Sequence, residues 1–371
     1  MFFDFYSNLS YTARMSNRIF SLFWSTKVAI VLLVLIILSC VVGVSMPSDV
    51  GKDFVFYSLW FNLLLVLLIV NIVFCIVKRT NVLRLSQAGS TIFHLGLVAL
   101  FVGVVYDQLF FFEGEIRLTE GESLVCADPA SWDVLKYGRF FRNQTLNELG
   151  QLYFHKLHIA YQEEGKFREE AIEISVGTDV QRGSRRIVYI ARPLKYKGFE
   201  LYREKRDGYS PLVVLRDKQG KVLLGSFVAL QSIRQQDGTF LYRSGTALEP
   251  GSFKFPQDPA IPPLYNIQTI YYPDKAQKGT GDISFKVWKY ITDDKDASEE
   301  LVNVKAAFGE RIKAGDYFLS LEEVRYWTSI YVTYRPGLTL IFSSFWIALG
   351  GLILNLSLKT AKSREKESMA A

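Results

Sequence analysis

Residues 85–106 read LSQAGSTIFHLGLVALFVGVVY and contain no Asp, Glu, Lys or Arg. This stretch of 22 residues is long enough to cross a hydrocarbon core of about 30 Å, because an α-helix rises about 1.5 Å per residue. Three more stretches of the 371-residue chain lack these four residue types in the same way, namely 28–48, 54–77 and 336–358. The sequence therefore predicts a membrane protein with four transmembrane helices.

Lys and Arg residues beside these stretches predict the orientation of the helices, because basic residues favour the cytoplasmic side. They are Arg14, Arg18 and Lys27 before the first stretch, Lys78, Arg79 and Arg84 after the second, and Lys359, Lys362, Arg364 and Lys366 after the fourth. We therefore expect segments 1–27 and 359–371 to face the cytoplasm. Segment 107–335, between the third and fourth stretches, is then extracytoplasmic, and the chain is expected in a bacterial inner membrane.

Composition excludes two classes of protein. Hydrophobic residues make up 49% of the chain, which is too many for a disordered protein. The net charge of +6 could indicate nucleic-acid binding, but segment 107–335 holds 32 basic and 32 acidic residues. The excess positive charge therefore lies beside the transmembrane stretches, and no nucleic-acid partner is predicted.

Segment 107–335 is predicted to be an all-β domain, either a sandwich or an open barrel. It consists of short alternating runs separated by Gly, Pro and Asp. The predicted strands are 152–161, 171–176, 186–190, 199–203, 212–215, 240–243, 283–288 and 317–321. Hairpin turns are predicted at 163–165, 217–220 and 236–238, and an exposed loop at 293–300.

His94 is the most informative single residue, because it lies near the middle of the third predicted helix. An ionisable side chain at that depth is costly and usually faces protein or a cavity. One alternative is a hydrogen bond to a neighbouring helix. The other is an axial bond to haem iron, for which a neutral imidazole is suited. No other predicted helix contains a histidine, so a second histidine ligand would have to come from another chain.

The remaining histidines and the cysteines carry weaker signals. His155 and His158 lie three residues apart in a predicted strand, so we expect them on opposite faces and exposed to solvent. The three cysteines, Cys40, Cys75 and Cys126, include no C-x-x-C pair. The chain is therefore neither a dithiol oxidoreductase nor a c-type cytochrome. Cys126 is either a reactive thiol or a buried one.

Aromatic residues after the third predicted helix have two interpretations, and small residues within the fourth have one. Phe110-Phe111-Phe112 could form a haem platform, but aromatic residues at a membrane boundary are more often interfacial anchors. Gly350 and Gly351, with Ser343 and Ser344, indicate close helix packing in the fourth helix. No familiar catalytic motif is present, and no catalytic residue is predicted.

The whole arrangement resembles the ResB/CcsB family of system II cytochrome c biogenesis proteins. Three closely spaced helices, a long outer β domain and a final helix occur in this order in the family. The local sequences that agree are Trp24-Ser25-Thr26-Lys27, His94-Leu95-Gly96, Gly114-Glu115-Ile116, Glu120-Gly121-Glu122, Pro193-Leu194-Lys195-Tyr196-Lys197-Gly198-Phe199 and Pro336-Gly337.

The resemblance implies that the chain handles or exports haem and presents it to apocytochrome c, together with a CcsA/ResC-like membrane protein. It also implies that His94 is an axial ligand of haem b iron, with the second ligand supplied by the partner. No tryptophan-rich haem motif of the partner's kind is present here. The chain by itself is therefore not expected to be an enzyme, but a component of a cytochrome c haem-lyase complex.

Two features depart from the family. The outer domain is compact for the family, and Arg335 stands before Pro336-Gly337 where many relatives have an acidic residue. A different class of function is also open. The chain could be a structural membrane subunit of a respiratory or multihaem cytochrome complex without haem handling of its own, or, as a third option, a sensor or adhesin.

Overall fold

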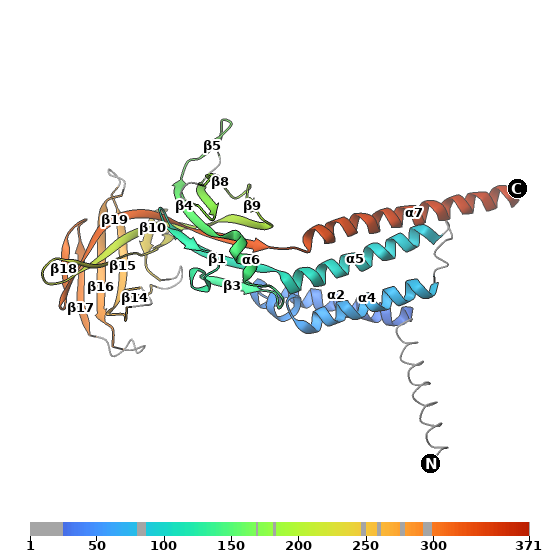
Figure 1. The fold of residues 1–371 in the computed structure, drawn as a ribbon, viewed down its shortest axis with the longest axis horizontal. Helices are drawn as coiled ribbons and strands as arrows, with labels where there is room; N and C mark the ends of the chain where they lie inside the picture. Colours follow the sequence, from blue (N-terminus) through green and yellow to red (C-terminus); the bar gives the residue numbers. More distant parts are fainter. Residues whose placement is uncertain are drawn as a thin grey trace, which may run out of the picture. The chain divides into compact units, whose positions relative to one another are not determined.

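The fold is taken from a computed structural model, which describes residues 25–79, 87–167, 170–180, 183–245, 250–257, 261–274, 279–291 and 299–370 (Figure 1). The chain divides into two compact units. The helical unit comprises Met1–Phe112, Tyr137–Arg142 and Tyr334–Ala371, and the β unit comprises Glu113–Lys136 and Asn143–Thr333. Residues 1–24 of the expected cytoplasmic segment 1–27, which include Arg14 and Arg18, lie outside the described residues. Arg84 and most of the expected loop 293–300 also lie outside them.

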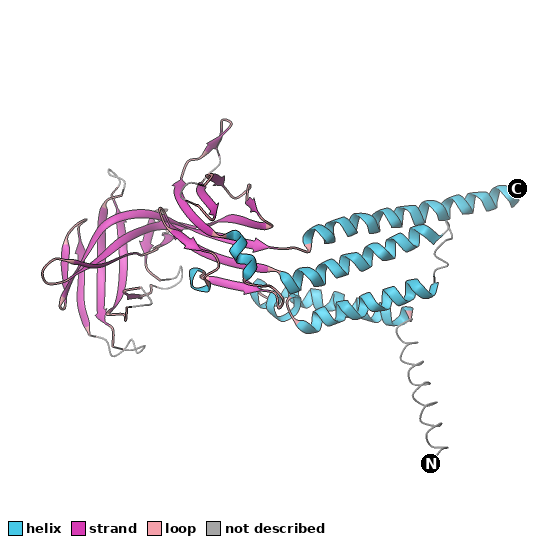
Figure 2. Cartoon of the chain, in the orientation of Figure 1, coloured by secondary structure: helices cyan, strands magenta, loops and turns pink. Residues whose placement is uncertain are grey.

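The described residues contain four helices that are long and apolar enough to cross a membrane (Figure 2). They are α2 (Thr26–Ser45), α4 (Leu59–Arg79), α5 (Ala88–Phe110) and α7 (Leu338–Ala370). Along the chain, three of them precede the strands and one follows. The prediction of a multi-pass membrane protein with four helices and a large β region is therefore confirmed.

Two helix boundaries differ most from the expected ones. The helix expected at 54–77 begins at Leu59, because a short helix, α3 (Ser48–Gly51), and a π-helical turn, η1 (Lys52–Phe56), precede it. The helix expected at 336–358 continues to Ala370. The residues after Leu358 are mainly Lys, Ala, Ser and Glu, and Lys, Ala and Glu have high helix propensity, so the charged segment does not end the helix.

Helices α5 and α7 pack with their backbones in close contact. Gly89, Gly96 and Gly103 recur every seven residues along α5, on the face toward α7. A Cβ atom at Gly96 would lie 2.6 Å from the backbone nitrogen of Ala348, and one at Gly351 would lie 2.4 Å from the backbone nitrogen of Phe93. Small residues permit this approach. The predicted role in packing is thus confirmed for Gly351, whereas a Cβ at Gly350 meets nothing within 4 Å.

The other face of α5 joins a separate apolar core. Buried side chains of α2 and α4, including Ile36, Leu65 and Leu68, form this core, and Val98 and Phe101 of α5 pack against it. Helix α5 is therefore placed between α7 on one side and the α2–α4 pair on the other.

The described residues of the β unit form three larger sheets and one short hairpin. The seven-stranded sheet has the order β11 (Val222–Phe227), β10 (Phe199–Arg216), β19 (Tyr317–Tyr334), β1 (Phe112–Thr119), β3 (Val134–Tyr137), with β9 (Leu194–Tyr196) paired to β10 and β18 (Arg311–Ala314) paired to β19. The six-stranded sheet has the order β12 (Gln231–Arg234), β13 (Phe240–Arg243), β15 (Tyr265–Pro273), β16 (Gly281–Lys289), β17 (Glu300–Ala306), with β14 (Phe253–Phe255) paired to β15.

The four-stranded sheet is built from strands early in the β unit, in the order β2 (Ser123–Val125), β4 (Gln151–His158), β7 (Ala171–Gly177), β8 (Arg186–Val188). The short hairpin is formed by β5 (Gln162–Glu163) and β6 (Lys166–Phe167). Two short helical segments, η3 (Pro129–Ser131) and α6 (Gln144–Leu149), complete the described elements.

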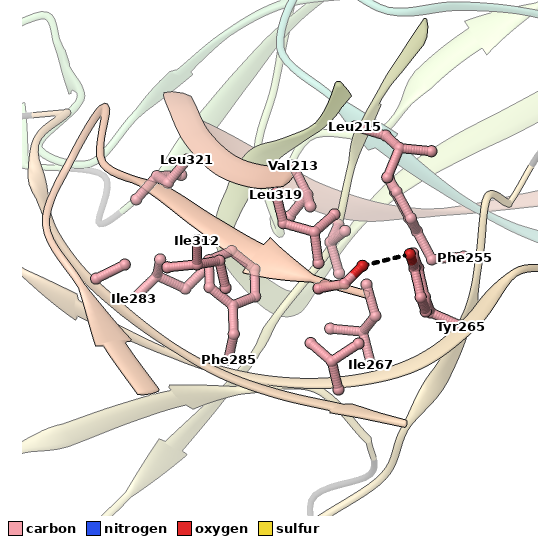
Figure 3. Close-up of a cluster of buried hydrophobic side chains, with 14 of the residues drawn as sticks. Val213, Leu215, Phe255, Tyr265, Ile267, Ile283, Phe285, Ile312, Leu319 and Leu321 are labelled. Atoms are coloured by element: carbon pink, nitrogen blue, oxygen red, sulfur yellow. Dashed lines mark hydrogen bonds between the residues drawn. The ribbon is translucent and has the colours of Figure 1, made fainter. Parts of the chain in front are cut away.

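The seven- and six-stranded sheets share one hydrophobic core (Figure 3). Phe285 and Leu319 are fully buried in it, and the Tyr265 hydroxyl donates to the carbonyl oxygen of Ala314 at 2.7 Å. This part of the β unit is a packed pair of sheets, as in a sandwich. The expectation of a single sandwich or open barrel is nevertheless incomplete, because the four-stranded sheet and α6 lie outside that pair.

The three predicted turns are confirmed. Residues 163–165, 217–220 and 236–238 each join two antiparallel strands. The strand predictions were less complete, because 199–203 and 212–215 belong to one 18-residue strand, β10. The strand predicted at 317–321 likewise extends to Tyr334 in β19.

Candidate functional site

His94 lies in the first third of α5, and one of its ring nitrogens is held by the helix itself. The Nδ1 atom lies 2.6 Å from the carbonyl oxygen of Ser90, four residues earlier. A carbonyl oxygen only accepts hydrogen bonds, so Nδ1 is the donor, and in the neutral ring Nε2 then has the free lone pair. The described hydrogen bond lies within one helix and does not join two, so the interhelical alternative is not the one observed.

The neighbours of His94 on its helix face are apolar. Residues four and seven positions further along an α-helix lie on the same side, which places Val98 and Phe101 next to His94. Both pack against the α2–α4 core. Gly96, two positions away, lies on the opposite side and contacts α7. The imidazole is therefore on the side of α5 that faces α2 and α4, and it is half-buried.

This arrangement suits one axial bond to haem iron. A metal-bound histidine usually donates from its second ring nitrogen to a carbonyl or carboxylate, which fixes its tautomer and orientation. The Ser90 carbonyl oxygen provides that acceptor. The described residues contain no group of three or more His, Cys, Asp or Glu that could hold a metal ion by itself. The chain's other histidines, His155 and His158, belong to the β unit.

A buried carboxylate near the end of α5 forms an ion pair and hydrogen bonds with the residues that directly precede α7. Asp107, with a side chain only 3% exposed, accepts from Arg335 Nε at 2.7 Å and from the backbone nitrogen of Gly337 at 3.1 Å. A Cβ at Gly337 would lie 2.4 Å from the Gly103 carbonyl oxygen. Arg335, which departs from the family pattern, thus has a defined partner. The sequence signal was an Asp directly after an apolar stretch.

The three phenylalanines after the third stretch are packed rather than open. Phe111 stacks on Tyr57 with 4.1 Å between ring centroids, and Phe112 stacks on Phe141 at 5.1 Å. Both are buried, with exposed fractions of 3% and 0%. Both rings are thus packed against other aromatic side chains, and the choice between a haem platform and interfacial anchors stays a prediction.

The prediction that His155 and His158 face opposite sides of a strand is wrong. A β-bulge at His155 shifts the register of β4 against β7. His155 Nε2 consequently lies 2.8 Å from Ser175 Oγ, and His158 Nε2 lies 3.2 Å from Glu173 Oε2. Ser175 and Glu173 are two residues apart in β7, so both histidines lie on the same face. Both are half-buried rather than fully exposed.

All three cysteines lie in the described part of the chain. All three are unpaired, and Cys126 is fully buried in the β unit. Burial raises the pKa of the Cys126 thiol to about 12, so the reactive thiolate is almost absent near neutral pH. Of the two alternatives for this residue, the structure supports the buried, unreactive thiol.

Comparison with known proteins places this arrangement in a family. A family model described as the ResB-like family matches residues 84–362, which include α5 with His94, the β unit and most of α7. A solved structure described as "Cytochrome c Heme Lyase CcmF" is similar at 13% identity and a TM-score of 0.28, and the match covers 89% of this chain. This chain corresponds to 34% of the length of that protein. No curated protein matches the chain. The family match extends over most of the sequence, and the chain therefore belongs to the ResB-like family.

Proposed function

We propose that this chain is a membrane component of a system II cytochrome c maturation complex. In this role it handles haem and, with a CcsA/ResC-like partner, presents it to apocytochrome c. Membership of the ResB-like family supports the general role in cytochrome c biogenesis. The observation that carries the haem role is the hydrogen bond from His94 to the Ser90 carbonyl oxygen, which leaves Nε2 available as a ligand.

His94 would supply one of the two axial bonds to the iron of haem b, which is the cargo of the complex. The ring is already oriented by its bond to Ser90, so little rotational freedom is lost on binding. Val98 and Phe101 lie on the same helix face, partly buried against the α2–α4 core, so the imidazole has apolar neighbours. Because the chain has no other histidine in its helical unit, we assign the second axial ligand to the partner.

The proposed setting is the inner membrane, with both termini in the cytoplasm and the β unit on the outer side. This follows from the Lys and Arg residues beside the helix ends. In that orientation the β unit would dock the partner and the apocytochrome. The chain would be a component of the haem lyase and would not complete the thioether chemistry alone.

The test is an absorption spectrum and haem assay on the purified chain, alone and co-expressed with a CcsA/ResC-like protein. We expect Soret and α bands in the co-expressed sample, and their loss in His94→Ala. Added imidazole should restore part of the bands, because it replaces the missing ligand without restoring the side chain. His155→Ala is the matched control and should leave the bands unchanged, since that residue lies in the β unit.

Two outcomes would contradict the proposal. Bands that persist in His94→Ala would exclude His94 as a ligand while leaving haem binding in place. Absence of haem in every sample, with cytochrome maturation intact after deletion of the gene, would favour the alternative of a structural subunit in a respiratory or multihaem cytochrome complex.

A further inference from the structure

A cavity in the β unit collects acidic and aromatic side chains from several strands. Its volume is about 210 Å³, and its walls include Glu170, Asp207, Tyr209, Tyr242 and Tyr326. Asp207 and Tyr209 belong to β10, Tyr242 to β13 and Tyr326 to β19, while Glu170 directly precedes β7. The cavity therefore forms where all three larger sheets of the β unit meet.

The two carboxylates of this cavity share one guanidinium group. Arg203 Nη2 donates to Glu170 Oε2 and also to Asp207 Oδ2, the latter at 2.7 Å. The Arg203 side chain is 2% exposed, whereas the side chains of Glu170 and Asp207 are 37% and 21% exposed. Two negative charges thus face one positive charge, and the carboxylates, not the guanidinium, are open to the cavity.

The excess of negative over positive charge affects the pKa of Asp207. Burial, followed by the nearby charge of Glu170, raises the pKa of Asp207 to about 6 although Arg203 opposes the shift. A pair of carboxylates in this state gains from any additional positive charge that comes within a few ångströms. A proton is one such charge, and a cationic ligand is another.

The tyrosines provide the second feature that a cation requires. The Tyr209 ring lies 4.6 Å from that of Tyr242 and 5.0 Å from that of Tyr326, measured between centroids. Electron-rich ring faces attract ammonium groups that lie within about 6 Å of them. The remaining wall contains Leu157 and Ile159, which suit an aliphatic chain.

A larger hollow of about 890 Å³ adjoins the cavity, since Leu157, Ile159, Tyr209 and Tyr326 line both. The hollow adds Glu120 and Asp274 to the acidic side chains, and Lys156 and His158 as basic ones. Its volume is about four times that of the cavity. The pair of spaces thus has room for one aliphatic ammonium side chain and for the chain segment on either side of it.

From this geometry we infer that the β unit binds a lysine-bearing polypeptide segment of a partner protein. The lysine ammonium group lies against Asp207, Glu170 and the tyrosine rings. Its methylene groups lie against Leu157 and Ile159, and the flanking residues occupy the larger hollow. This inference does not depend on the haem role of His94, so either can fail without the other.

The test is fluorescence anisotropy with a fluorescein-labelled pentapeptide that has a central lysine, added to the full chain in detergent at pH 7.5. We expect saturable binding, and binding weaker by about tenfold for the same peptide with norleucine, which lacks the ammonium group. Asp207→Asn and Glu170→Gln should each weaken binding of the lysine peptide to a similar degree. Glu170→Gln is the safer of the two for folding, because Glu170 is the more exposed carboxylate.

Asp316→Asn is the matched control and should bind like the wild type, because Asp316 is 78% exposed and pairs with Lys218 away from the cavity. Equal affinity for the lysine and norleucine peptides would overturn the inference, as would unchanged binding in Glu170→Gln. Competition by n-butylammonium at the same concentration as the peptide would also overturn it, because a free amine would then be sufficient and the polypeptide would contribute nothing.

Discussion

Local hydrogen bonds determine what individual residues of this chain can do chemically. The Nδ1 atom of His94 donates to the Ser90 carbonyl oxygen, which in the neutral ring places the free lone pair on Nε2. Cys126 is in the opposite condition, since burial raises its pKa to about 12 and suppresses the thiolate. Both are single ionisable side chains in apolar surroundings. The hydrogen bond of His94 and the raised pKa of Cys126 distinguish the candidate ligand from the unreactive thiol.

Asp207 gives a prediction for stability at the same scale. Its pKa is raised from the usual value of 3.8 to about 6, so the folded state holds a proton more tightly than the unfolded chain does. Its contribution to stability is therefore complete below about pH 4 and is lost as the pH rises through about 6. We expect the unfolding midpoint of the wild type to fall over this interval relative to that of Asp207→Asn, which cannot titrate there.

The measurement is the midpoint of thermal unfolding followed by tryptophan fluorescence between pH 4 and pH 8. Other groups titrate in both proteins, so the difference between the two curves isolates the carboxylate pair. Glu170→Gln keeps Asp207 and should show a smaller fall than the wild type, because the nearby charge of Glu170 is one cause of the raised pKa of Asp207. If the midpoints of the wild type and of Asp207→Asn differ by a constant amount from pH 4 to pH 8, the pKa of Asp207 is not raised and the prediction is wrong.

Helix α5 is the element that connects the parts of the helical unit. Its glycine face packs on α7, its apolar face packs on the α2–α4 core, and its end is joined to the start of α7 through Asp107 and Arg335. His94 lies on the apolar face. The contacts on the glycine face therefore fix the rotation of the helix and, with it, the direction in which the imidazole points.

Substitution at Gly96 tests this packing. A Cβ there would lie 2.6 Å from the backbone nitrogen of Ala348, so Gly96→Ala must separate α5 from α7. We expect it to destabilise the folded protein in detergent by about 1–3 kcal/mol. Gly350→Ala is the control, because its Cβ meets nothing within 4 Å and it should be neutral or stabilise the helix by up to about 1 kcal/mol. Equal unfolding midpoints for the two variants would show that the close contact of α5 and α7 at Gly96 does not contribute to stability.

The elements also show how far the sequence could predict this fold. The four helices were predictable because each apolar stretch is a local property with a fixed length requirement. The strand β10 was not predicted in full, since Arg206, Asp207 and Gly208 interrupt its alternation and resemble a turn. In the sheet β10 lies between β11 and β19, and pairing with a strand as distant in the chain as β19 is not visible in a local pattern.

The candidate sites also differ in whether a local pattern or long-range folding determines them. His94 could be found from the sequence because it is the only histidine in an apolar stretch. The cavity around Asp207 could not, because its walls come from strands that are far apart in the chain. The positions of His155 and His158 on one face likewise depend on a β-bulge, which no pattern in the sequence predicts.

For the whole molecule, the arrangement of charge predicts one orientation in the membrane. Basic residues exceed acidic ones only beside the helix ends expected in the cytoplasm, whereas 107–335 is electrically balanced. We therefore expect an impermeant maleimide to label Asp237→Cys in intact spheroplasts, since residue 237 lies at an exposed turn of the β unit. Ser368→Cys, near the C-terminus, should be labelled only after the membrane is opened. Both changes belong in a background in which Cys40, Cys75 and Cys126 are serine. Labelling in the reverse order would place the β unit in the cytoplasm, where it could not meet an apocytochrome outside the membrane, and the proposed function would fail with the topology.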